Sequence, residues 1–139
     1  LCEQILDAHP DDRDALYGFA RCALAADEHD HAIDALETLV AMDIAYLDSL
    51  PAAELVHAYA DAASVDDALT LAERLCRKSQ RIGPRVLFAT YLLAEERDDE
   101  ARTLLERGLV TFGSSPAYVR RRDRLDARAA KALLRSLAG

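Results

Sequence analysis

One pattern recurs three times in this sequence, and its spacing constrains the fold more than any other feature. Each copy has acidic residues just ahead of an alanine, followed by apolar residues at helical spacing. The alanines that align are Ala32, Ala68 and Ala101, which lie 36 and then 33 positions apart. Because a repeated unit of this size cannot bury its apolar face alone, neighbouring units are expected to stack on one another.

Each repeat is predicted to be a pair of antiparallel helices. Apolar spacing predicts one helix in every alanine-containing stretch, and the acidic residues in its first turn face the positive end of the helix dipole. A partner helix is predicted ahead of each, over residues 14–26, 49–63 and 84–95. Links of two to four residues then force consecutive helices into hairpins. Nothing alternates with a period of two, so the fold class is predicted to be all-α.

All three of these helices carry start signals, and Asp12 is a candidate N-cap of the first. Ser49 is a predicted N-cap ahead of Pro51, and Gly83 is a predicted N-cap ahead of Pro84. At the other end of the helix pairs, the turns contain Asp27, Ala63 and Glu96. The three turns therefore differ in side chain although they occupy equivalent places.

Small and apolar residues occupy matching places in the three helix pairs. In the first pair they are Leu16, Phe19, Ala20, Ala23, Ala32, Leu36 and Leu39; in the second, Leu55, Val56, Tyr59 and Ala68; in the third, Phe88, Ala89, Leu92 and Ala101. Helix pairs of this kind about every 34 residues resemble the tetratricopeptide repeat. The resemblance covers residues 13–113 and implies a right-handed superhelical solenoid. The chain lacks the family's tryptophan and has no glycine at its usual turn position.

The resemblance implies a single tetratricopeptide-like domain over residues 1–139. Its parts are 1–10 as the second helix of a truncated preceding repeat, 13–45, 49–81 and 82–114 as three repeats, and 115–139 as a capping helix. Three other all-helical architectures stay open. Pentatricopeptide arrays bind RNA and would be basic, HEAT-type units would need a longer period, and a plain helical bundle needs no repeat.

Charge is distributed unevenly along the chain. The formal net charge is −8, but residues 1–60 carry −11 and residues 116–139 carry +5. Because nucleic-acid affinity comes largely from neutralising phosphates, no nucleic-acid partner is expected for the acidic body. No window approaches the roughly 18 apolar residues of a membrane span.

The basic C-terminal segment is predicted to be the capping helix, over 116–137, with a break near Asp123. Its expected apolar stripe consists of Tyr118, Leu125, Ala129, Leu133 and Leu137. The arginine cluster beside that stripe consists of Arg120, Arg121, Arg122 and Arg124. This cluster is interpreted as a solvated face, as a contact with the acidic half of another copy, or as a contact with anionic lipid or nucleic acid.

By resemblance, the first helix of each repeat lines a concave groove that binds peptides. The groove residues that this implies are Asp14, Tyr17, Arg21, Leu24, Glu54, His57, Asp61, Val86, Leu87, Thr90 and Leu93. An apolar floor with acidic edges favours a basic or amphipathic peptide. The implied function is a non-catalytic protein–protein interaction scaffold. The alternative is an oligomerisation or regulatory module of a larger protein that assembles through its acidic body and basic C-terminal helix.

The sequence holds no nucleophile–base set, so no catalytic residue and no cofactor are predicted. His29 and His31 lie in an acidic turn and lack the one-turn spacing of metal ligands, so no metal is predicted either. Cys2, Cys22 and Cys76 fall in apolar helical patterns and are expected to be buried free thiols. Free thiols suggest a reducing compartment, which gives a cytoplasmic location as the expectation.

Overall fold

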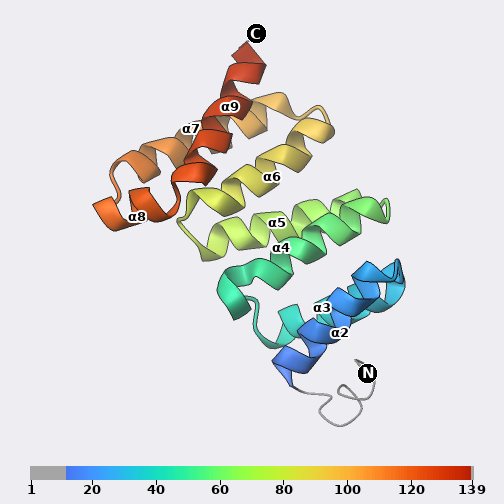
Figure 1. The fold of residues 1–139 in the computed structure, drawn as a ribbon. Coiled ribbons are helices and arrows are strands. Elements are labelled where there is room, and N and C mark those ends of the chain that lie inside the picture. The colour runs from blue at the N-terminus through green and yellow to red at the C-terminus, as the bar shows by residue number, and fades with distance from the viewer. Residues whose placement is uncertain (1–11, 139) are drawn as a thin grey trace. The chain divides into compact units, whose positions relative to one another are not determined.

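The computed structural model describes residues 12–138, and every regular element in that range is an α-helix (Figure 1). The helices are α2 (Arg13–Ala25), α3 (His29–Met42), α4 (Tyr46–Asp61), α5 (Val65–Lys78), α6 (Ile82–Ala94), α7 (Asp98–Gly113), α8 (Ala117–Arg122) and α9 (Arg124–Ala138). The all-α prediction is therefore confirmed for this range. The helix predicted over 1–10 lies outside the described residues.

The chain divides into two compact units, Leu1–Ala68 and Leu69–Gly139. In the described part of the first unit, α2 packs on α3 and α3 packs on α4. In the second unit, α6 and α7 form a hairpin, α9 packs against both of them, and α8 contacts α7.

The three alanines that mark the repeats are buried. Ala32, Ala68 and Ala101 all have an exposed fraction of 0%. A methyl side chain in the first turn allows a neighbouring helix to approach closely, whereas a larger side chain would not fit a well-packed interior. A glycine serves the same purpose in the second unit, because a β-carbon at Gly108 of α7 would lie 2.7 Å from Cδ1 of Ile82 in α6.

The turns that close the three hairpins have the same backbone geometry. Asp27, Ala63 and Glu96 have φ values of 58°, 62° and 60°, which is the left-handed region. In each turn the following residue donates its backbone N–H to a carbonyl five positions earlier: Glu28 to Ala23, Ser64 to Tyr59 and Arg97 to Leu92, at 2.8 to 2.9 Å. This is the Schellman motif, which usually has glycine at the left-handed position. The repeat spacing of the sequence is therefore also a repeat of backbone conformation.

Ala63→Gly and Glu96→Gly are each expected to raise the free energy of unfolding by about 0.5–1 kcal/mol. An alanine or glutamate in the left-handed region destabilises the folded state by about 1–2 kcal/mol. Glycine removes this strain, but part of the gain in stability is lost because glycine makes the unfolded chain more flexible. Urea denaturation followed by circular dichroism measures the change. Asp27→Gly serves as the comparison and should gain less, because Asp tolerates this conformation better. A loss of stability in both glycine variants would contradict the strain argument.

The starts of two helices differ from the sequence prediction. Leu47, Asp48 and Ser49 all have positive φ values, and the Ser49 hydroxyl donates to the Ile44 carbonyl, so Ser49 does not cap a helix. The regular part of α4 follows this left-handed turn. Arg81 is the N-cap residue of α6, so this helix begins one residue before the predicted Gly83 cap.

Candidate functional site

In the first unit, one tyrosine connects the first helices of two successive repeats. The Tyr17 hydroxyl of α2 donates a hydrogen bond of 2.8 Å to Oε1 of Glu54 in α4. Burial of Tyr17, followed by its contact with the Glu54 carboxylate, raises the pKa of the phenol. The second Glu54 oxygen, Oε2, is also buried and has no hydrogen-bond partner among the described residues. A buried oxygen that accepts no hydrogen bond destabilises the folded state.

A second tyrosine extends the same face. The rings of Tyr17 and Tyr46 meet edge to face with their centroids 6.3 Å apart. The Tyr46 hydroxyl donates to Asp14, and this hydrogen bond raises the pKa of Tyr46 to about 12. The guanidinium carbons of Arg13 and Arg21 lie 5.7 Å from the ring centroids of Tyr46 and Tyr17, respectively. Both arginines among residues 12–68 are therefore engaged by aromatic rings, and the carboxylates around them give the face its charge.

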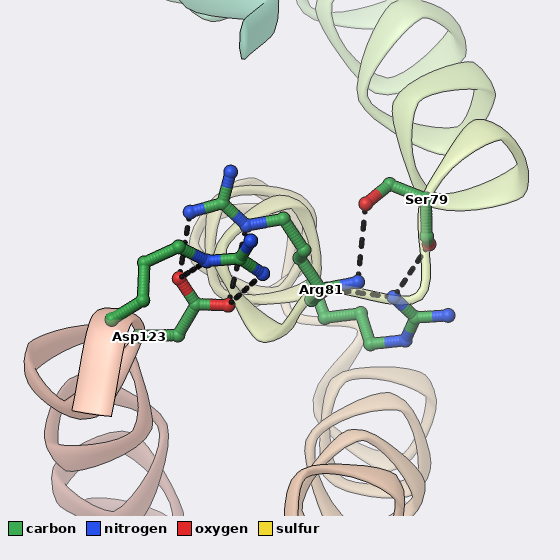
Figure 2. Close-up of polar contacts among 5 residues, drawn as sticks. Ser79, Arg81 and Asp123 are labelled. Atoms are coloured by element: carbon green, nitrogen blue, oxygen red, sulfur yellow. Dashed lines mark hydrogen bonds and ion pairs between the residues drawn. The ribbon is translucent and has the colours of Figure 1, made fainter. Parts of the chain in front are cut away.

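In the second unit, a buried carboxylate fastens the C-terminal helices to the start of α6. Asp123, which is 2% exposed, lies between α8 and α9. Arg81 donates to it from Nε at 3.2 Å and from Nη2 at 2.6 Å, and Arg122 donates from Nε and Nη2 at 3.1 Å each (Figure 2). Burial alone would raise the pKa of Asp123, but hydrogen bonds from these two arginines outweigh it and lower the pKa.

The loop ahead of α6 is held by the same group of side chains. The backbone N–H of Arg81 donates to Oγ of Ser79 at 3.1 Å, and Arg85 donates to the carbonyls of Ser79 and Arg81 at 2.9 and 2.8 Å (Figure 2). α9 also lies against the first turn of α6, since Oδ2 of Asp126 would be 3.0 Å from a β-carbon at Gly83. These contacts fix the position of α9 on the α6–α7 hairpin.

The α6–α7 hairpin carries a shallow groove that the sequence analysis missed. Its volume is about 440 Å³, and its lining consists of Phe88, Leu92, Asp99, Glu100, Thr103, Leu104 and Arg107. The sequence pattern does not predict this groove. Phe88 and Leu92 lie one helical turn apart, and that spacing is the same whether another helix covers the two side chains or leaves them open. The acidic residues at the groove are ion-paired to arginines of their own turn, Asp99 with Arg102 and Glu100 with Arg97.

Comparison with known protein families gives a match at the start of the chain. Residues 1–43 match the family model described as Tetratricopeptide repeat. This stretch is similar to a tetratricopeptide repeat. No curated protein and no solved structure matches it. Tetratricopeptide repeats generally mediate protein–protein interactions. The matched span contains α2 and α3, whose connecting turn has the same backbone conformation as the turns at Ala63 and Glu96.

The groove residues implied by the tetratricopeptide resemblance lie in both units. In the first unit Asp14, Arg21, His57 and Asp61 are exposed, Leu24 and Glu54 are half-buried, and Tyr17 is buried. In α6 of the second unit Val86, Leu87 and Leu93 are half-buried and Thr90 is exposed. Within the first set, a hydrogen bond joins Tyr17 of α2 to Glu54 of α4. That contact joins residues 37 positions apart, and no local pattern in the sequence indicates it.

The C-terminal segment of the chain corrects one sequence prediction. The helix breaks at Asp123 as expected, but Tyr118 and Leu125 of the predicted apolar stripe are 62% and 71% exposed. The buried positions of α9 are instead Ala127 and Ala130. The break at Asp123 places Tyr118 on α8 and the other four residues of the stripe on α9, so the spacing does not run along one helix. Of the arginine cluster, Arg122 binds Asp123, and Arg120, Arg121 and Arg124 are exposed.

Among residues 12–138, no group of three or more His, Cys, Asp or Glu side chains could hold a metal ion. Within that same range, the helices are all too short or too polar to cross a bilayer. The cysteine prediction is wrong for Cys22, which is exposed and disulfide-bonded. Cys76 is a half-buried free thiol, and burial raises its pKa to about 11. The thiol argument for a reducing compartment thus loses support, and the cytoplasmic location stays a prediction.

Proposed function

We propose that this chain is a non-catalytic scaffold that binds a peptide segment of a partner protein on the face formed by α2 and α4. The observation that carries the proposal is the hydrogen bond from Tyr17 to Glu54, which holds the first helices of two repeats side by side. A surface held rigid by such contacts loses little conformational entropy when a ligand binds. Protein binding is also the general role of tetratricopeptide repeats.

The charge of this face favours a basic or amphipathic peptide. Asp14, Glu54 and Asp61 supply carboxylates, while Arg13 and Arg21 lie over tyrosine rings. A cationic side chain of the ligand would be attracted by these carboxylates, of which Asp14 and Asp61 are exposed. An acidic peptide would be repelled by the same groups.

The corresponding helix of the third repeat, α6, carries apolar side chains in the second unit. Its Val86, Leu87 and Leu93 are half-buried, and Thr90 already donates its hydroxyl to the Val86 carbonyl at 2.8 Å. Side chains of this kind supply area for an amphipathic ligand and no strong directional bond. The charge preference is therefore assigned to α2 and α4 of the first unit.

Fluorescence anisotropy with three synthetic peptides tests the proposal: a basic amphipathic peptide, its charge-reversed counterpart and a scrambled control. We expect only the basic peptide to bind, and the double variant His57→Ala, Asp61→Lys to weaken its binding by at least about tenfold. Asp98→Lys makes the same charge change on α7 and should leave binding unchanged. Equal binding by both variants, or preference for the acidic peptide, would exclude the α2–α4 face. The anisotropy is measured at near-physiological salt, so that long-range electrostatic attraction between peptide and protein is screened.

The alternative function, an oligomerisation or regulatory module, is favoured by a different observation. The basic residues of α9 are exposed and lack carboxylate partners among the described residues, whereas other arginines of the same unit have them. Such a module would use other faces than α2 and α4, so the two functions are compatible.

A further inference from the structure

Helix α9 presents a row of exposed basic side chains. Arg124, Arg128, Lys131 and Arg135, here called the basic stripe, follow one another at intervals of four, three and four residues. Residues at this spacing lie along one line of a helix, over about 16 Å. All four are exposed, and no described carboxylate pairs with any of them.

Several arginines of the same unit are ion-paired, in contrast to the basic stripe. Arg97 and Arg102 of the second unit form ion pairs in their own helix turns, and Arg81 and Arg122 share Asp123. Leu125, which is largely exposed, lies next to the stripe. A row of uncompensated charge beside an exposed apolar side chain is typical of a surface that meets another molecule.

Helix α3 of the first unit has the complementary surface. Asp30, Asp34 and Glu37, here called the acidic stripe, are exposed and lie four and three residues apart. Glu37 accepts a hydrogen bond of 2.6 Å from the Tyr59 hydroxyl. None of the three pairs with a cation among the described residues, and the arginines of this unit, Arg13 and Arg21, are engaged at the tyrosine rings.

The two stripes match in spacing as well as in sign. Asp30, Asp34 and Glu37 repeat the four-and-three spacing of Arg124, Arg128 and Lys131. We propose that two copies of this chain associate head to tail, with the basic stripe of one copy lying along the acidic stripe of the next. Because each copy carries both stripes, the contact is heterologous and can add further copies.

A second copy fits the basic stripe better than other anionic partners do. Residues 1–60 carry a charge of −11, which would repel a nucleic acid or an anionic membrane brought close to the chain. The same charge attracts the basic stripe of another copy. Since the chain as a whole carries −8, the association is local to the two stripes, weak and sensitive to salt.

Sedimentation velocity over a range of protein concentrations tests the proposal by charge reversal. At about 50 mM salt the average mass should rise with concentration, and at about 500 mM it should be that of the monomer. The variants Arg124→Glu, Arg128→Glu, Lys131→Glu and, separately, Asp30→Lys, Asp34→Lys should each be monomeric at both salt concentrations. An equimolar mixture of the two variants restores opposite charges at both contacts and should associate again.

A control variant with the same charge change must keep the association. Arg74→Glu, Lys78→Glu, Arg107→Glu reverses three exposed bases outside the stripe, and circular dichroism verifies that every variant is folded. A monomeric wild type at low salt, or a mixture that stays monomeric, would overturn the proposal. Retention on heparin or on anionic vesicles without self-association would overturn it as well, in favour of a polyanion or a membrane surface.

Discussion

Leu105→Ala should lower the free energy of unfolding of the second unit by about 3–4 kcal/mol, the largest single effect expected for this chain. Leu105 has an exposed fraction of 0% on α7, which packs against α6 and α9. Truncation removes the buried methyl groups and leaves a cavity that the surrounding helices fill only in part. Because a unit of this size is stable by only a few kcal/mol, such a variant should be partly unfolded at 37 °C.

Urea denaturation followed by far-ultraviolet circular dichroism measures this effect, since the chain contains no tryptophan. Val110→Ala provides the matched control, because Val110 lies on the same helix with 74% of its surface exposed. Its substitution should change the stability by no more than about 0.5 kcal/mol. Equal losses in the two variants would show that α7 is not buried in the way described.

Asp123→Ala should cost the second unit about 2–3 kcal/mol. Removing the carboxylate leaves Arg81 and Arg122 without the acceptor that both guanidinium groups share. Breaking a buried ion pair from one side usually costs about 3–5 kcal/mol. The loss is smaller here because the Arg81 and Arg122 side chains are 34% and 45% exposed and can be solvated. Asp99→Ala, at a fully exposed ion pair on α7, should cost less than about 1 kcal/mol.

The contribution of Asp123 should also depend on pH in a defined direction. Its pKa in the folded chain is lowered by the two arginines, below the value of about 4 for an unfolded aspartate. The stabilisation is therefore complete above about pH 4 and is lost as the pH falls through the folded pKa. Urea titrations between about pH 6 and pH 2 should show the wild type and Asp123→Asn approaching each other in stability at the acid end. A constant difference would argue against the ionised carboxylate.

The repeat was predictable from the sequence because its cause is local. Ala32, Ala68 and Ala101 recur at the spacing of the helix pairs, and the structure buries all three. The pattern also locates the turn residues, but side chains as different as those of Asp27 and Glu96 do not predict one shared backbone conformation. That conformation follows from the hydrogen bonds at the helix ends, which do not depend on the side chain.

The candidate site was less predictable, because its contacts join distant residues. Tyr17 and Glu54 belong to different helices, and their hydrogen bond depends on how α2 and α4 are placed by α3. The apolar stripe of the C-terminal helix failed for a related reason. The predicted stripe spans Asp123, where the ion pairs with Arg81 and Arg122 hold the chain at a break, so its residues lie on two helices.

The left-handed turn at Leu47, Asp48 and Ser49 accounts for the unequal lengths of the repeats. α3, α5 and α7 begin at His29, Val65 and Asp98, so the first interval is three residues longer than the second. A left-handed turn of three residues can accommodate an insertion of three residues without shifting the register of the helices on either side. Variation in length between repeats is thereby absorbed at the junctions, and the hairpins keep their internal dimensions.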